Sequence, residues 1–198
     1  MAKGNEIKKP RNVFLSASVP KAGREFFGTG DVIAIRDSVI ALASAVIANT
    51  DYHLIWGGHP SITPLITLVL KRYNLKMSDR VTLYQSAHFK EKFPPENKDV
   101  GIRIITADTG EAASSVELMR KKMFSENSFY AAVFIGGMNG IREEYRMIKE
   151  YNHDVRCFPV ASTGAAARAL YDAHPGEFDE RLLTELSYTS LFKELLGV

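Results

Sequence analysis

The chain has very little cysteine: Cys157 is the single one among 198 residues. One cysteine excludes an internal disulfide and any metal site that needs several cysteines. Because Cys157 lies in the apolar run 155–160, we expect it to be a buried structural residue. Long apolar runs are also missing, and the longest, 39–48, predicts a buried helix rather than a membrane span. The charged start, 3–11, is followed by no apolar segment, so we expect no secretory signal, no membrane partner and a cytoplasmic location.

Charge of either sign is not in strong excess. The chain has 25 Lys and Arg against 23 Asp and Glu, a formal net charge of +2. A charge this small gives no electrostatic support for nucleic-acid binding. The 45% hydrophobic and 24% charged residues are typical of a globular protein. We therefore predict a basic N-terminal tail over residues 1–11 and a single domain over residues 12–198.

Several motifs with known chemistry are missing as well. The chain has no G-x-G-x-x-G after a strand and no Walker A motif, which disfavours standard dinucleotide oxidoreductases and NTPases. It has no G-x-S-x-G and no H-E-x-x-H, which argues against serine hydrolases of that type and zinc peptidases. Its five histidines do not have metal-ligand spacing. We predict no metal site and no cofactor.

Short apolar runs alternate with amphipathic segments along the chain. The predicted strands are 12–16, 53–56, 81–85, 102–106, 130–135 and 155–160. The predicted helices are 31–49, 64–73, 110–124, 142–151, 163–173 and 178–196. This alternation predicts βαβ units with right-handed crossovers. The fold class is α/β: a single doubly wound, Rossmann-like domain with a mostly parallel sheet of about six strands and helices on both faces.

Turns rich in Gly, Ser, Thr and Asn follow four of the predicted strands. In doubly wound sheets, ligands bind outside the carboxyl ends of the strands. Small residues at these positions favour a nucleotide-like ligand, because they allow close approach and supply hydroxyl groups. The ligand-binding residues predicted from these turns are Ser16, Ser18, Gly57, Gly58, His59, Ser61, Gly136, Gly137, Met138, Asn139, Gly140, Ser162 and Thr163.

The stretch 135–144, Ile-Gly-Gly-Met-Asn-Gly-Ile-Arg-Glu-Glu, is the most informative of these turns. It predicts a strand, a glycine turn and the start of a helix. A helix N-terminus offers unpaired N–H groups and a positive dipole end, which suit a phosphate. Glu143 and Glu144 would lie in the first turn, within reach of ribose hydroxyls or a reacting sugar carbon. The alternative is an ordinary tight β–α turn.

Two glycine turns together resemble the SLOG superfamily. Gly57-Gly58-His59-Pro60 and the motif 136–144 carry the resemblance, which extends over about residues 12–173. The superfamily includes the LONELY GUY phosphoribohydrolases, the DNA-processing Smf proteins and ligand-sensing domains of antiphage systems such as Thoeris. Its enzymes have P-G-G-x-G-T-x-E-E at this turn and an arginine in a preceding R-K-x-M-like helix, which Arg120 matches. The resemblance implies that Arg120 with Glu143 or Glu144 is the catalytic pair.

This chain departs from the enzymes in the same motif. It has Ile135 in place of proline, Ile141 in place of threonine, and two residues, Met138 and Asn139, where the enzymes have one. The inserted residue is expected to shift the register between the glycines and the glutamates. The segment 14–20 is more similar to the sensor-type domains, for which the resemblance implies binding of messengers derived from NAD, such as cyclic ADP-ribose isomers.

Two functions follow. The first is a sensor in antiphage signalling that holds a nucleotide-derived ligand, with Lys21, Arg24 or Arg120 neutralising phosphate and Glu144 accepting ribose hydroxyls. The second is a phosphoribohydrolase that cleaves the N-glycosidic bond of a nucleoside monophosphate. A nucleic-acid binder of the Smf type has less support. We also expect a homo-oligomer, because segments 110–124 and 178–196 have surplus apolar residues, and an effector protein or domain in trans.

Overall fold

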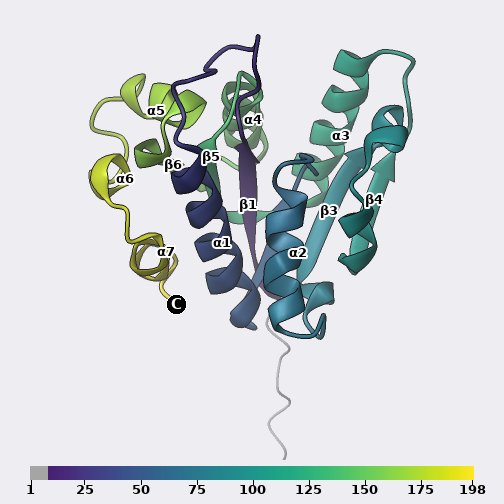
Figure 1. Ribbon diagram of the computed structural model, residues 1–198, viewed down its shortest axis with the longest axis horizontal. Coiled ribbons are helices and arrows are strands. Elements are labelled where there is room, and N and C mark those ends of the chain that lie inside the picture. The colour runs from purple at the N-terminus through teal and green to yellow at the C-terminus, as the bar shows by residue number, and fades with distance from the viewer. Residues whose placement is uncertain (1–8) are drawn as a thin grey trace, which may run out of the picture.

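The computed structural model describes residues 9–198 as a single α/β domain (Figure 1). The predicted basic tail over residues 1–11 falls mostly on residues 1–8, which lie outside the described residues. The end of that predicted tail, Arg11, is the first residue of a strand. No helix in the described part of the chain is long and apolar enough to cross a membrane.

Six parallel strands form one sheet in the order β4-β3-β2-β1-β5-β6. Their bounds are β1 Arg11–Ser18, β2 Tyr52–Trp56, β3 Val81–Ser86, β4 Ile102–Thr106, β5 Phe129–Gly136 and β6 Arg156–Val160. Each predicted strand is confirmed within two residues at either end. The fold class is confirmed too, and the sheet is parallel throughout.

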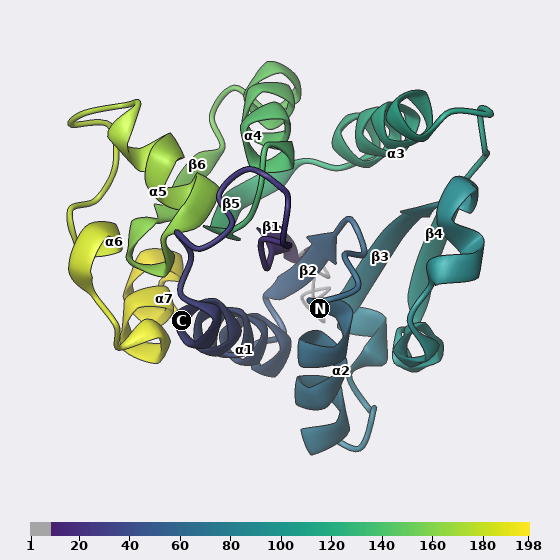
Figure 2. The same ribbon diagram turned by 45° about the horizontal axis from the view of Figure 1, so that its top comes forward.

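Helices cover both faces of this sheet (Figure 2). One face packs against α1, α2 and α7, and the other against α3, α4 and α5. The bounds are α1 Val32–Ala48, α2 Thr63–Arg72, α3 Ala112–Glu126, α4 Gly140–Tyr151, α5 Ala165–Asp172, α6 Arg181–Thr184 and α7 Tyr188–Leu196. Short 3-10 turns lie mainly between β3 and β4.

The C-terminal helix predicted over residues 178–196 is wrong in one respect, because the segment is divided between α6 and α7. The backbone at Glu185 is extended, with φ −71° and ψ 129°. The Glu185 carboxylate accepts the Ser187 N–H at 2.6 Å, and its carbonyl accepts the Ser162 hydroxyl at 3.0 Å. These bonds to side chains pair the Ser187 N–H and the Glu185 carbonyl outside a helix. Side chains commonly compete with helical backbone hydrogen bonds in this way.

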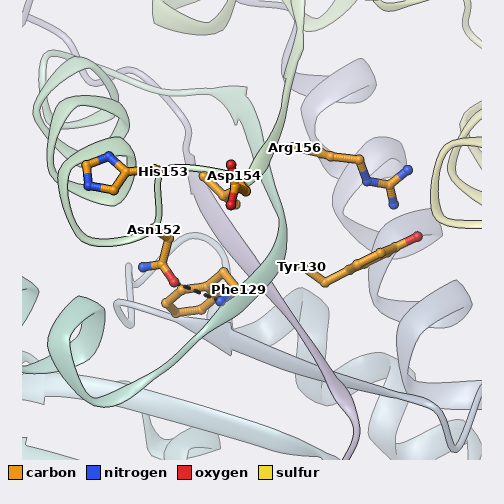
Figure 3. A pocket seen from close by; sticks show the side chains of 7 residues that line it. Phe129, Tyr130, Asn152, His153, Asp154 and Arg156 are labelled. Carbon is orange, nitrogen blue, oxygen red and sulfur yellow. Dashed lines mark hydrogen bonds between the residues drawn. The ribbon is translucent and has the colours of Figure 1, made fainter.

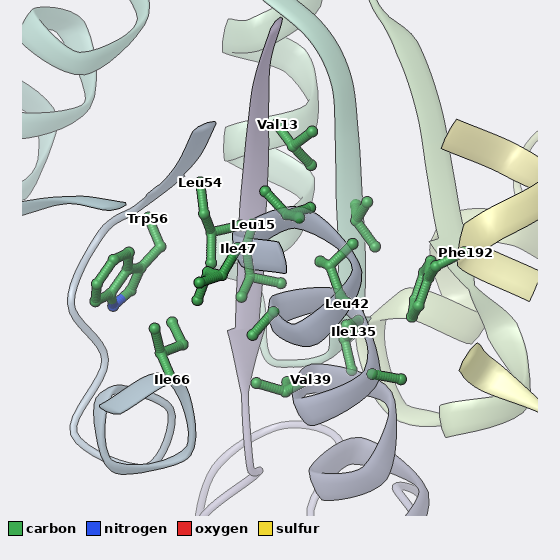
Figure 4. Close-up of a cluster of buried hydrophobic side chains, with 14 of the residues drawn as sticks. Val13, Leu15, Val39, Leu42, Ile47, Leu54, Trp56, Ile66, Ile135 and Phe192 are labelled. Carbon is green, nitrogen blue, oxygen red and sulfur yellow. The ribbon is translucent and has the colours of Figure 1, made fainter. Parts of the chain in front are cut away.

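The core is divided by the sheet into two apolar clusters. In β1, Val13 and Leu15 pack toward α1 and α7, together with Leu42 and Phe192 (Figure 4). Phe14, between them in sequence, packs into the opposite cluster with α3 and α4. Alternate strand residues face opposite sides of a sheet, so Ser16 and Ser18 share the face of Phe14. The central strand therefore directs its terminal hydroxyl groups toward α3 and α4.

Candidate ligand-binding site at the carboxyl edge

The ends of β1 and β5 are neighbours at the centre of the sheet, with Ser18 opposite Gly136. From there the chain leaves toward opposite faces, because β1 leads into α1 and β5 leads into α4. Such a point of reversal is where doubly wound sheets hold their ligands. The predicted ligand edge and the glycine motif thus coincide with the switch point of the sheet.

A three-residue cluster of Ser16, Arg120 and Glu144 lies at this point. Arg120 Nε donates to Glu144 Oε1 at 3.0 Å, and the Ser16 hydroxyl donates to Glu144 Oε2. The side chains of Arg120 and Glu144 are only 16% and 13% exposed. A charge-assisted bond in such shielded surroundings is stronger than a surface ion pair and fixes both groups. Residues from β1, α3 and α4, far apart in sequence, therefore form one rigid polar cluster.

The other glutamate of the motif, Glu143, is not part of this cluster. Its carboxylate pairs with Arg146 at 2.6 Å on the outer side of α4, and its side chain is 45% exposed. This hydrogen bond with Arg146 lowers the pKa of Glu143 below its usual range. Of the two glutamates that sequence left open, Glu144 is the one that meets Arg120.

The additional residue in the glycine motif does not prevent contact between Glu144 and Arg120, and the expected shift of register relative to the enzymes stays a prediction. Asn139 has helical φ and ψ values of −48° and −27° and is exposed directly before α4. Its side-chain amide donates to the Glu25 carboxylate in the loop between β1 and α1. The helix begins at Gly140, directly after this residue.

The N-terminus of α4 keeps several backbone donors unpaired. The two glycine N–H groups before it are used internally, because Gly136 donates to Thr163 Oγ1 at 2.8 Å. Gly137 donates to the Ser18 carbonyl at 2.7 Å. The next three N–H groups have no acceptor within residues 9–198, and they belong to Met138, Asn139 and Gly140. Unpaired donors at the positive end of a helix form an anion-binding site.

The Arg120 guanidinium group lies close to the backbone of Gly140, at the same end of α4. Arg120 Nη2 lies 3.5 Å from the Gly140 carbonyl oxygen. A Cβ added at Gly140 would lie only 2.8 Å from that Nη2 atom. The missing side chain is therefore what allows the guanidinium group to approach the backbone, and the positive charge adds to the free N–H groups.

The second glycine turn is used differently from the prediction. At the start of α2, Ile62 and Thr63 donate their N–H groups to the His59 carbonyl, and Pro64 has none. Ser61 N–H donates to His59 Nδ1 at 3.2 Å. The N–H groups of Ser61, Ile62 and Thr63 are thus already used, and the turn has for a ligand its first residues, Gly57 and Gly58, and the His59 ring.

His59 is a neutral hydrogen-bond donor in this arrangement. Its Nδ1 accepts from Ser61 N–H, so in the neutral ring the proton resides on Nε2. Ser61 Oγ also lies 2.8 Å from Nδ1 and accepts the Val19 N–H at 3.3 Å. Burial, reinforced by the positive charge of Lys21, lowers the pKa of His59 to about 4. The Ser61 hydroxyl links the two loops, and the His59 Nε2–H group remains for a ligand.

This depressed pKa predicts a stability change with pH. An unfolded histidine takes up a proton below about pH 6.5, whereas native His59 does so only near pH 4. Because the unfolded state binds more protons, the free energy of unfolding should fall by on the order of 2 kcal/mol as pH drops from 7 to 4. Urea titrations of the wild type and His59→Gln measure this contribution. An equal fall in both proteins would contradict it.

The remaining predicted residues have different surroundings. Thr163 Oγ1 accepts from Gly136 and donates to the Val160 carbonyl at 2.6 Å, so this buried hydroxyl supports the turn. The Ser162 hydroxyl faces Glu185 and Tyr188 near α7, away from α4. Ser18 is buried beside the glycine turn. Lys21 and Arg24 are exposed on the loop after β1 and have no ion-pair partner among the described residues.

A hollow of about 360 Å³ lies at the opposite, amino edge of the sheet (Figure 3). It is lined by residues at the starts of β5 and β6 and in the turn after α4, among them Tyr130, His153 and Arg156. Its Asn152 side chain accepts the Phe129 N–H at 3.0 Å and so closes the sheet edge. Neither a glycine turn nor a free helix N-terminus lies there, so we place the candidate site at the carboxyl edge.

Fold and site together define a Rossmann-like protein with free N–H groups at a helix N-terminus and a largely shielded Arg–Glu pair at the switch point. Comparison with family models shows that the chain belongs to the SLOG cluster3 family, whose model matches residues 25–196. The predicted SLOG membership is thus confirmed. The fold is similar to that of the crystal structure of TM1055, with a TM-score of 0.61, 13% sequence identity and coverage of 93% of this chain and 99% of that one. No curated protein matches the chain.

Proposed function

We propose that this SLOG domain binds a phosphate-bearing, nucleotide-derived ligand at the carboxyl edge and acts as a sensor of it. The observation that carries the proposal is the α4 N-terminus, where three unpaired N–H groups lie beside the Arg120 guanidinium. Backbone donors, the helix dipole and a fixed cation all favour the same negatively charged group. In this proposal the ligand's phosphate lies on Met138, Asn139 and Gly140.

The sugar and base would extend from α4 toward β2. Val19, which follows β1, is joined to the β2 turn through Ser61. The His59 Nε2–H group can donate to an uncharged oxygen such as a ribose hydroxyl or a carbonyl, and it does so as a neutral group above about pH 5. Phosphate at α4 and a neutral donor at β2 match the two ends of a nucleoside phosphate. Messengers derived from NAD, such as cyclic ADP-ribose isomers, belong to this class.

A hydrolase is the second candidate, and the Ser16–Glu144–Arg120 cluster favours it. Cleavage of an N-glycosidic bond passes through an oxocarbenium-like sugar, which a nearby carboxylate stabilises while water attacks the anomeric carbon and the base departs with a proton. Glu144 is an ionisable carboxylate at the right edge for this role. We favour a sensor because the glycine motif departs from that of the enzymes, with Ile135 in place of proline, Ile141 in place of threonine and one additional residue.

A sensor also requires a partner that responds to the bound ligand. We propose an effector protein or domain in trans and a role in defence signalling, as for the sensor-type SLOG domains that the sequence resembles. We also propose a homo-oligomer, although α7 has no surplus apolar face for it. Its apolar residues Leu191, Phe192 and Leu195 are buried in the cluster on the α1 side of the sheet.

Thermal shift combined with chromatography separates the two candidates. The protein is incubated with AMP, NAD and cyclic ADP-ribose isomers, and free base is quantified. A ligand at about 100 times its Kd stabilises by about 2.7 kcal/mol, which raises Tm by roughly 5–10 °C in a chain of this length. We expect such a rise without turnover. Release of base that Glu144→Gln abolishes would contradict the sensor, and no shift with any nucleotide at millimolar concentration would contradict both.

A further inference from the structure

The loop between β1 and α1, residues 19–31, places a carboxylate beside the proposed anion site. Glu25 in this loop accepts a hydrogen bond from the side-chain amide of Asn139. Asn139 is the residue that precedes α4, so the contact brings a negative group to the N-terminus of that helix. A carboxylate there is favoured by the same partial positive charge that favours a phosphate. The sequence pattern contains no signal for this contact, because the two residues are 114 positions apart.

We propose that Glu25 is an internal substitute for the ligand's anionic group and that a bound phosphate displaces it. The inference rests on the proposed function and describes how that site is regulated. It also gives a role to Asn139, one of the two residues that stand where the hydrolases have one. The longer turn supplies the amide that retains the loop in the absence of ligand.

The middle of the loop is held loosely, whereas both of its ends are fixed. At the start, Val19 N–H donates to Ser61 Oγ at 3.3 Å. At the end, Asp31 N–H donates to the Thr163 carbonyl and Ala165 N–H to the Thr29 carbonyl, both at 3.1 Å. Between these anchors, residues 20–28 make only local turn bonds within the backbone. Displacement of Glu25 therefore moves a short segment and leaves the sheet and α1 unchanged.

Phe26, next to Glu25, has a strained backbone conformation. Its φ is +67°, a left-handed value that is uncommon for an aromatic residue. The ring lies 5.6 Å from the Arg142 guanidinium on α4. Phe27, the following residue, is 59% exposed. Phe26 also packs against the core cluster on the α4 side, so displacement of Glu25 would allow this ring to leave the core, which is a change that an effector could recognise.

Removal of the competing carboxylate should tighten phosphate binding. Glu25 is exposed, so its contact is modest, and a ligand that must displace it loses only the corresponding fraction of its affinity. We expect Glu25→Ala and Asn139→Ala each to bind AMP and inorganic pyrophosphate about three- to tenfold more tightly by calorimetry. The double variant should gain no more than either single one. Glu143→Gln is the control, because it removes the same charge from the first turn of α4 without touching the loop.

Limited proteolysis tests the loop contact without any ligand. Trypsin can cut after Lys21 and Arg24, which are exposed, and Asn139→Ala leaves the sequence around both sites unchanged. We expect this variant to be cut severalfold faster than the wild type, and Glu143→Gln to be cut at the wild-type rate. Wild-type binding of AMP with no gain in Glu25→Ala would overturn this inference but not the proposed function. Absence of anion binding in the wild type and all variants would overturn the proposed function.

Discussion

Arg120→Ala is expected to weaken AMP binding by about 10- to 100-fold and to lower the stability of the domain. The guanidinium contributes a charge-assisted bond to the phosphate in our account, and such bonds contribute about 1.5–3 kcal/mol. Its removal also leaves the Glu144 carboxylate, only 13% exposed, with Ser16 as its one remaining partner. An unpaired, largely buried charge is destabilising and would also repel an approaching phosphate.

Lys121→Ala is the matched control, because Lys121 is next in sequence, exposed, and paired with Glu117 on the outer side of α3. Calorimetry with AMP and urea titration measure both effects. The account predicts losses in Arg120→Ala and near wild-type values in Lys121→Ala. Equal affinities of Arg120→Ala and the wild type would show that the phosphate does not bind beside this guanidinium.

Gly140→Ala is expected to separate ligand binding from stability. Gly140 lies in the first turn of α4, where alanine is favoured over glycine by up to about 1 kcal/mol. The added Cβ would meet Arg120 Nη2 at 2.8 Å and force the flexible end of that side chain away from the helix N-terminus. We expect an unchanged or higher Tm together with about tenfold weaker AMP binding. Wild-type affinity in this variant would contradict the placement of Arg120.

Gly137→Ala is expected to have the opposite effect on stability, because alanine at this position strains the backbone. Gly137 has φ +83°, and an added Cβ would lie 2.1 Å from Ile141 Cδ1. We expect a loss of about 2–4 kcal/mol in the free energy of unfolding, from left-handed strain and displacement of a buried side chain. The glycines of one motif thus have different roles: Gly137 permits the turn and Gly140 admits the arginine.

Much of the fold follows from the sequence, because each strand is a short apolar run and most helices are apolar or amphipathic segments of sufficient length. The alternation of Val13, Phe14 and Leu15 between two apolar clusters is what a strand covered on both faces requires. The break between α6 and α7 was not predictable from periodicity. At this break the Glu185 carbonyl accepts a hydrogen bond from Ser162, which follows β6 and is distant in sequence.

The location of the candidate site follows from the sequence, but its contacts do not. Turn composition identifies the carboxyl edge, and the family motif identifies Arg120 and a glutamate. The choice between Glu143 and Glu144 depends on the residue at which α4 begins. Because the motif has one residue more than that of the enzymes, the sequence alone does not determine this start, which the structure places at Gly140. Ser61 and Thr163 were predicted to contact ligand, yet their hydroxyls bind neighbouring loops. Such side chains satisfy buried backbone groups, and a sequence pattern does not distinguish the two uses.

The most direct test of the central claim is a ¹⁵N chemical-shift titration of the wild-type protein with AMP. The account predicts that the largest amide shifts occur at the start of α4, in Met138, Asn139 and Gly140, because their free N–H groups bind the phosphate. Arg120→Ala should reduce these shifts at the same AMP concentration. Shifts confined to the amino-edge hollow around Asn152–Arg156, with the start of α4 unchanged, would contradict the account.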